Sequence, residues 1–124
     1  IKDDTLLIGG AGFNSFDTDS CATVMMVGGK GDNVFNGGTG INYFDLGSGT
    51  NSVVTGTFLN EVDCAGTSSL DLYGGNLIFL GGTTTIFAEA DSYGILVGTR
   101  KEFLATQFAA DPDADCYIGI IVWC

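Results

Sequence analysis

A nine-residue spacing of similar segments constrains this sequence more than any other feature. Three segments align directly: GGAGFNSFD at 9–17, GGKGDNVFN at 28–36 and GGTGINYFD at 37–45. LGSGTNSVV at 46–54 and TGTFLNEVD at 55–63 continue the same register. A repeat of this kind indicates units that stack on one another, because one short unit cannot bury its own apolar side chains.

Each unit contains a polar residue, a spacer and a large apolar residue, as in Asn33-Val34-Phe35. Alternate side chains of a strand point to opposite sides, so the apolar member can enter a shared core while the spacer faces solvent. The glycines supply the positive φ angles that sharp turns between strands require. The pattern therefore predicts an all-β fold, a β-solenoid or β-roll-like stack of short strands.

The polar member of the unit is most often asparagine. Stacked amide side chains can hydrogen-bond along the axis as a ladder and so satisfy polar groups inside the turns. The alternative is that asparagine only suits a left-handed turn position. The residues of the expected ladder are Asn14, Asn33, Asn42, Asn51, Asn60 and Asn76.

The last third of the chain has a different pattern. Thr99-Arg100-Lys101-Glu102 has the form of a capping box, apolar residues follow at helical spacing, and Pro112 ends the segment. We expect one domain over 1–124, with the repeat stack at 4–98, a short helix at 99–111 and an apolar terminal strand at 116–124.

The segments at 9–17, 28–36 and 37–45 resemble the glycine-rich nonapeptide G-G-x-G-x-D-x-(large apolar)-x of secreted repeats-in-toxin (RTX) proteins. The resemblance covers residues 4–63. It implies a parallel β-roll with two units per turn, and calcium bound at the glycine turns by the sixth-position aspartate. Here asparagine holds the sixth position and only Asp4 keeps the acid, and amides are poorer ligands for calcium than carboxylates.

Composition excludes several classes of function. The net charge of −11 opposes binding to nucleic acid, and no stretch approaches the length of apolar residues that membrane insertion needs. The chain has no histidine, so a Ser-His or Cys-His nucleophile is impossible, and we expect no enzyme activity. Asp111, Asp113 and Asp115 open like a calcium loop, but Cys116 stands where an EF-hand needs glycine. Thr83, Thr84 and Thr85 form a single run, which favours ordinary strand threonines over an ice-binding array.

Four cysteines, Cys21, Cys64, Cys116 and Cys124, are candidates for disulfides or crosslinks. Their even number and the lack of a C-x-x-C motif favour an extracellular or cell-surface location. Three pairings within the chain are open, as are bonds between chains. This glycine-rich, cysteine-bearing composition is similar to that of amyloid-like sheath proteins of methanogenic archaea.

The ends of the repeat stack suggest a function. The chain enters a repeat at once and finishes on an apolar strand, whose Ile120, Ile121, Val122 and Trp123 form a candidate assembly edge. We expect a structural protein whose partners are copies of itself, assembled into a fibre, sheath or layer. The alternatives are that this strand pairs within its own chain, and that the protein is a calcium-binding RTX-type module. A carbohydrate-binding or carbohydrate-degrading β-helix has only the fold in its favour.

Overall fold

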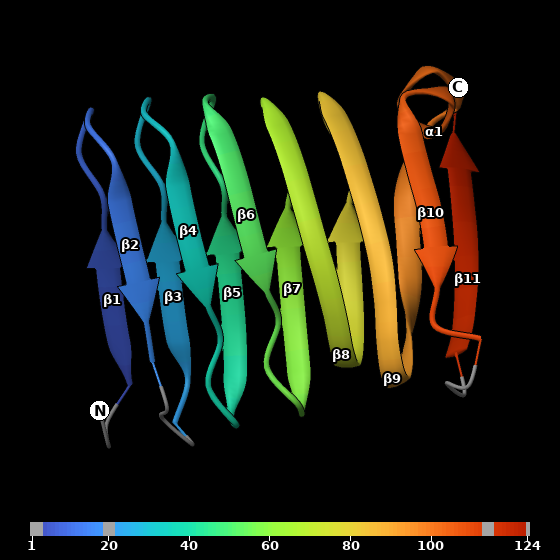
Figure 1. The fold of residues 1–124 in the computed structure, drawn as a ribbon, viewed down its shortest axis with the longest axis horizontal. Helices are drawn as coiled ribbons and strands as arrows, with labels where there is room; N and C mark the ends of the chain where they lie inside the picture. Colours follow the sequence, from blue (N-terminus) through green and yellow to red (C-terminus); the bar gives the residue numbers. More distant parts are fainter. Residues whose placement is uncertain (1–3, 19–21, 113–115, 124) are drawn as a thin grey trace.

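The chain folds into a parallel β-solenoid of about six turns in a computed structural model that describes residues 4–18, 22–112 and 116–123 (Figure 1). The short strands are β1 (Thr5–Ile8), β2 (Asn14–Asp17), β3 (Val24–Val27), β4 (Asn33–Asn36), β5 (Ile41–Asp45), β6 (Thr50–Val54) and β7 (Leu59–Asp63). After them come β8 (Thr67–Phe79), β9 (Thr83–Thr99), α1 (Arg100–Leu104), β10 (Thr106–Ala110) and β11 (Cys116–Trp123). The predicted all-β solenoid with a short helix and a terminal strand is confirmed.

Alternate strands lie in two facing layers. The front sheet contains β2, β4, β6, the first halves of β8 and β9, and β10 (Figure 1). The back sheet contains β1, β3, β5, β7, the second halves of β8 and β9, and β11. All of these pairs are parallel, so each strand repeats the direction of the strand one coil earlier.

Two nine-residue units make one coil. Stacked asparagines lie 19 and 18 residues apart in the early coils and 16 apart later, where the two strands of a coil join into β8. Each unit therefore supplies one strand and one turn, and consecutive units contribute to opposite sheets.

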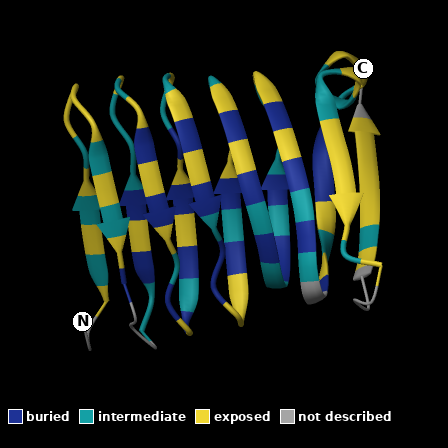
Figure 2. Cartoon of the chain, viewed as in Figure 1, coloured by how far each residue is buried: buried dark blue, intermediate teal, exposed yellow. Residues whose placement is uncertain are grey.

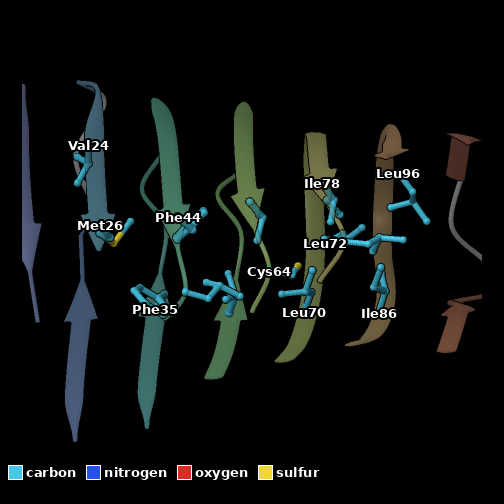
Figure 3. Packing of buried hydrophobic residues seen from close by; sticks show 14 residues of the cluster. Val24, Met26, Phe35, Phe44, Cys64, Leu70, Leu72, Ile78, Ile86 and Leu96 are labelled. Carbon is cyan, nitrogen blue, oxygen red and sulfur yellow. The ribbon is translucent and has the colours of Figure 1, made fainter. Parts of the chain in front are cut away.

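The core lies between the two sheets and runs along the stack. Burial alternates along each strand, and the inward residues Met26, Phe35, Phe44 and Ile78 are at most 2% exposed (Figure 3). Phe35 contacts Phe16 and Phe44, with ring centroids 5.1 Å and 6.0 Å away. The apolar third member of each unit therefore builds one continuous core.

The glycines have two distinct roles. Gly47, with a φ of 77°, has the left-handed conformation expected at a turn, and Gly66, Gly74 and Gly82 have φ values of 63°, 60° and 61°. Gly29 does not have a positive φ, but a Cβ atom there would collide with the carbonyl oxygen of Gly10 in the adjacent coil. The expectation of positive φ at every turn was therefore too broad, since some glycines are required by the close approach of neighbouring coils.

The predicted helix at 99–111 is wrong over its second half. The capping box is present, because the Glu102 N–H donates to Thr99 Oγ1 at 3.2 Å and the Thr99 N–H donates to Glu102 Oε1 at 2.8 Å. The helix nevertheless ends at Leu104, and 106–110 form β10 against the front half of β9. The edge of β9 offers a row of backbone partners, which a short isolated helix cannot match.

Candidate assembly surfaces

A ladder of three asparagines runs inside the front sheet. Asn14 Nδ2 donates to Asn33 Oδ1 at 2.9 Å, and Asn33 Nδ2 donates to Asn51 Oδ1 at 2.8 Å. The next two positions in register are Ser68 and Thr84, whose hydroxyls donate to carbonyls of their own turns at 3.0 and 3.3 Å. The amide ladder therefore extends over the first three coils and gives way to hydroxyls.

A second ladder runs inside the back sheet. Asn42 Nδ2 donates to Asn60 Oδ1 at 3.1 Å, and Asn60 Nδ2 donates to Asn76 Oδ1 at 3.4 Å. Asn42 also binds its own turn, because its Nδ2 donates to the Gly38 carbonyl at 3.0 Å and its Oδ1 accepts the Gly38 N–H at 3.1 Å. The single series of asparagines in the sequence thus divides into two, because consecutive units belong to opposite sheets.

The amide nitrogens fill the glycine turns. Asn33 Nδ2 donates to the carbonyls of Gly31 at 2.9 Å and Leu46 at 3.3 Å, as well as to the next asparagine. An N–H group with partial positive charge therefore contacts these carbonyl oxygens, so the acceptors are satisfied by the side chain.

In the part of the chain that the structure describes, no strand pairs with the outer side of the N-terminal coil, which is formed by β1 and β2. The N–H groups of Thr5 and Gly9 donate to carbonyls of the next coil at 3.0 and 2.7 Å. Because backbone groups alternate sides along a strand, those of Leu6 and Ile8 point away from the stack. The side chains of Leu6 and Ile8 are 57% and 68% exposed.

The C-terminal coil, formed by β10 and β11, presents the opposite edge. The predicted assembly edge 120–123 lies on β11, which pairs along one side with β9 of the same chain. Its other side faces away from the stack, and Ile120, Ile121 and Val122 are 52–62% exposed (Figure 2). The side chain of Trp123 lies outside the described residues.

A hollow of about 300 Å³ opens at this C-terminal end. Its lining consists of the inward-facing residues of the last coil, one residue of the coil below and one residue of α1: Thr106, Phe108, Ile118, Ile120, Leu96 and Phe103. Phe108 is 45% exposed, whereas its stacked neighbour Ile86 is fully buried. The hollow is therefore continuous with the interior of the solenoid at its last described coil.

Cys64 lies in the core between the sheets (Figure 3). It is 5% exposed and free, so it reaches neither the surface nor another described cysteine. Burial, followed by the negative charge of Asp63, raises the pKa of its thiol to about 12, against a hydrogen bond with Thr84 that lowers it. Cys21, Cys124 and the side chain of Cys116 lie outside the described residues.

The outer face of the back sheet is apolar with a charged centre. Met25 and Tyr43 are 43% and 38% exposed there, and a shallow hollow beside them includes Asp45, Glu61 and Asp63. Asp45 and Asp63 stack in register on adjacent coils. Partial burial, followed by repulsion from Asp45, raises the pKa of Asp63 above its ordinary value.

Other hydroxyl residues stack in register on the threonine run at 83–85, although the run of three threonines itself occurs once, as the sequence indicates. Thr83 stacks in register on Thr67, and Thr67 on Thr50. A parallel exposed column contains Ser52, Ser69 and Thr85, whereas Thr84 is buried. The sequence did not reveal this array, because the shortened coils place its members 16 or 17 residues apart rather than on the nine-residue repeat.

Two further features of the described ranges bear on function. In residues 4–18, 22–112 and 116–123, no helix is long and apolar enough to cross a membrane. In the same ranges no group of three or more histidine, cysteine or acidic residues is arranged to hold a metal ion. Of the acidic run at 111–115, Asp113 and Asp115 lie outside the described residues.

Replacing Asn42 with aspartate should destabilise the solenoid. The change removes a buried donor and places a carboxylate against carbonyl oxygens, so we expect N42D to lower the free energy of unfolding by about 3 kcal/mol at pH 7. Burial raises the folded-state pKa of the new carboxyl, so the loss should be small near pH 3 and grow as the pH rises above about 4. Urea unfolding over this pH range measures it. The exposed change S52D, whose stacked neighbours Val34 and Ser69 are uncharged, is the control, and an equal loss in both variants would contradict a special role for the ladder.

The buried thiol of Cys64 should be chemically silent in the folded protein. Its raised pKa keeps it protonated at pH 8, and the core excludes reagents. We expect a thiol-reactive maleimide to leave Cys64 unlabelled in buffer and to label it in urea, as read by mass spectrometry of the peptide. Rapid labelling in buffer would show that this part of the core opens readily.

The stacked carboxylates should cost stability at neutral pH. The pKa of Asp63 is higher in the folded protein than in the unfolded chain. The stability that depends on its protonated form is therefore fully present below about pH 4 and is lost as the pH rises through the folded pKa. We therefore expect D63N to raise the melting temperature at pH 7 and to leave it unchanged near pH 3. D17N removes an equal charge from a position stacked on neutral Asn36, so it serves as the control. Equal effects of both variants would attribute the gain to net charge alone.

No protein-family model, no curated protein and no solved structure matches this chain.

Proposed function

We propose that this protein is a structural subunit that assembles head to tail with copies of itself. In this assembly the N-terminal coil of one copy stacks on the C-terminal coil of the next, which yields a fibre, sheath or layer outside the cell. The observation that carries the proposal is the pair of open edges, β1 with β2 at one end and β10 with β11 at the other.

The two edges are complementary by direction. Every stacked pair in the solenoid is parallel, so a further copy added at the C-terminal end would continue both sheets without reversing a strand. Such a contact joins two different surfaces of the same molecule. A heterologous contact of this kind generates a ring or an open filament rather than a closed dimer.

The composition of the edges also supports stacking. Soluble proteins protect exposed edge strands with charged residues, prolines or a covering segment. β1, β10 and β11 contain no charged residue and no proline, and β2 contains one charged residue, Asp17. Exposed Leu6, Ile8 and Ile121 lie on these strands instead, so pairing with another copy would remove apolar surface from water as well as satisfy backbone groups.

An extracellular setting is proposed from the cysteines. The buried thiol of Cys64 cannot join two copies while the core is intact. Crosslinks that reinforce an assembly would therefore involve Cys21, Cys116 or Cys124, and an oxidising compartment is where such bonds persist.

The alternative function is a calcium-binding module, for which the RTX-like segments are the supporting observation. The amide donors at the glycine turns favour self-assembly over this alternative. Calcium at millimolar concentration should therefore leave the melting temperature of the native chain unchanged. A rise of several degrees on adding calcium, reversed by a chelator, would instead support the module.

Blocking one edge should stop assembly without unfolding the protein. The backbone N–H of Ile8 points away from β3, so proline at this position removes an outward donor and keeps every internal bond. We expect ordered fibres of the native chain in negative-stain images, and about tenfold slower growth for I8P at an unchanged melting temperature.

I8T is the matched control, because it changes the side chain and keeps the N–H group. Equal fibre growth of I8P and I8T would remove β1 from the interface. Monomeric particles of the native chain at all concentrations would overturn self-assembly itself.

A further inference from the structure

The hollow at the C-terminal end lies where the next coil of the stack would lie. Resting on the proposed head-to-tail assembly, we infer that the N-terminal coil of a second copy fills this hollow in a single register. Leu7 of the incoming copy then lies over Ile120, and its Phe16 lies over Phe108. This interior register, rather than edge pairing alone, determines how the copies are joined.

The back-sheet interior is one column of apolar side chains in register. Leu7 is half-buried at the start of this column and Ile120 ends it, 62% exposed. The column consists of Leu7, Met26, Phe44, Val62, Ile78, Leu96 and Ile120. A second copy that continues the ladder places another Leu7 next to Ile120.

The front-sheet interior has the same arrangement. Its column consists of Phe16, Phe35, Val53, Leu70, Ile86 and Phe108. Phe16 stacks on Phe35 with ring centroids 5.1 Å apart, and it is half-buried because nothing in the described chain lies on its other side. Phe108 is an aromatic surface of the same kind at the far end, so the incoming Phe16 meets a second phenylalanine there.

The helix α1 extends the inferred contact surface beside the front sheet. Phe13 precedes β2 and is 71% exposed, and Leu104 at the end of α1 is 78% exposed. In the inferred register, position 13 of the incoming copy follows position 105 in the stack, beside Leu104. Two of the most exposed apolar side chains in the described chain are thus covered by one contact.

The contact is large enough for a specific interface. Two sheets about 10 Å apart, with about 5 Å of outward side chain on each, are about 20 Å wide, and with a length of about 25 Å the end surface is about 500 Å² per copy. The total of about 1,000 Å² reaches the lower limit for specific protein interfaces. The backbone ladder continues across the contact, which adds hydrogen bonds in two sheets at once.

Other registers leave the hollow unfilled. A shift of one residue turns Leu7 and Phe16 out of the core, because strand side chains alternate. A shift of two residues moves Phe16 from Phe108 to Thr106 or Ala110. Among the registers that place β1 on β11 and β2 on β10, only the continued one matches the two half-buried residues of the first coil to the open hollow.

Disulfide trapping between two single-cysteine additions tests the register. Ser15 and Gln107 are exposed ends of one outward column, five coil steps or about 24 Å apart within a copy, too far for a bond. Across the inferred contact they are direct neighbours. We mix S15C chains with Q107C chains, oxidise them during fibre growth and identify linked peptides by mass spectrometry.

The result expected is a peptide link between positions 15 and 107, at least tenfold more abundant than the link between S15C and A109C chains. The A109C position is two residues out of register and serves as the matched control. Fibres without an excess of the 15–107 link would overturn the register and leave the proposed assembly standing. No fibres and no link would overturn both.

A second pair of variants tests the inferred contact at Phe13 without added cysteines. F13S removes a side chain that should be buried only between copies, so we expect the concentration needed for fibre growth to rise about tenfold at an unchanged melting temperature. F58S removes a 53% exposed phenylalanine from a turn in the middle of the stack and should leave that concentration unchanged. Equal behaviour of the two variants would contradict the inferred contact.

Discussion

Hydrogen bonding along the solenoid axis is the interaction on which the other features of this protein depend. Parallel backbone pairing sets a fixed spacing between coils, of about 4.8 Å, and every inward side chain must fit that spacing. Asn33 and Asn42 meet it by bonding to the next coil and to their own turns at once. Gly29 meets it by having no side chain to collide with Gly10. The asparagines and some glycines of the repeat thus answer one constraint.

The same constraint explains why the ends differ from the middle. An interior coil has a partner on each side, so Phe35 and Ile86 are fully buried, whereas the corresponding Phe16 and Phe108 at the two ends are not. In the described part of this chain no further strand pairs with the first or the last coil, and the last coil presents the bonding pattern that the first coil would accept. In the proposed assembly, the contact that stacks coils within a copy would also join one copy to the next.

Sequence reasoning reached the architecture because the repeat couples local and long-range structure. A unit such as Asn33-Val34-Phe35 specifies its turn, its inward faces and its stacking partner together. The sequence-based prediction failed where tertiary contacts decide the local structure. Residues 106–110 have helical spacing, but they pair as a strand with the open edge of β9. The division of the asparagines into two ladders and the outward column of Thr50, Thr67 and Thr83 depend on coil length, which a nine-residue period does not specify. The hollow beside Phe108 is a property of where the stack stops, and no local pattern encodes it.

The choice of amide over carboxylate at the turns has a consequence for assembly. A stack of aspartates would place like charges one coil apart, as Asp45 and Asp63 are on the outer face, and would need a cation in each coil to hold it together. An amide carries both a donor and an acceptor, so each asparagine supplies what the next one requires and the ladder is neutral. Asn14 begins the front ladder at the open N-terminal coil, and Thr106 stands in the same inward position of the last coil. A contact between copies would then bring two neutral polar side chains together inside the core, so coils of different molecules can stack by the same chemistry as coils of one.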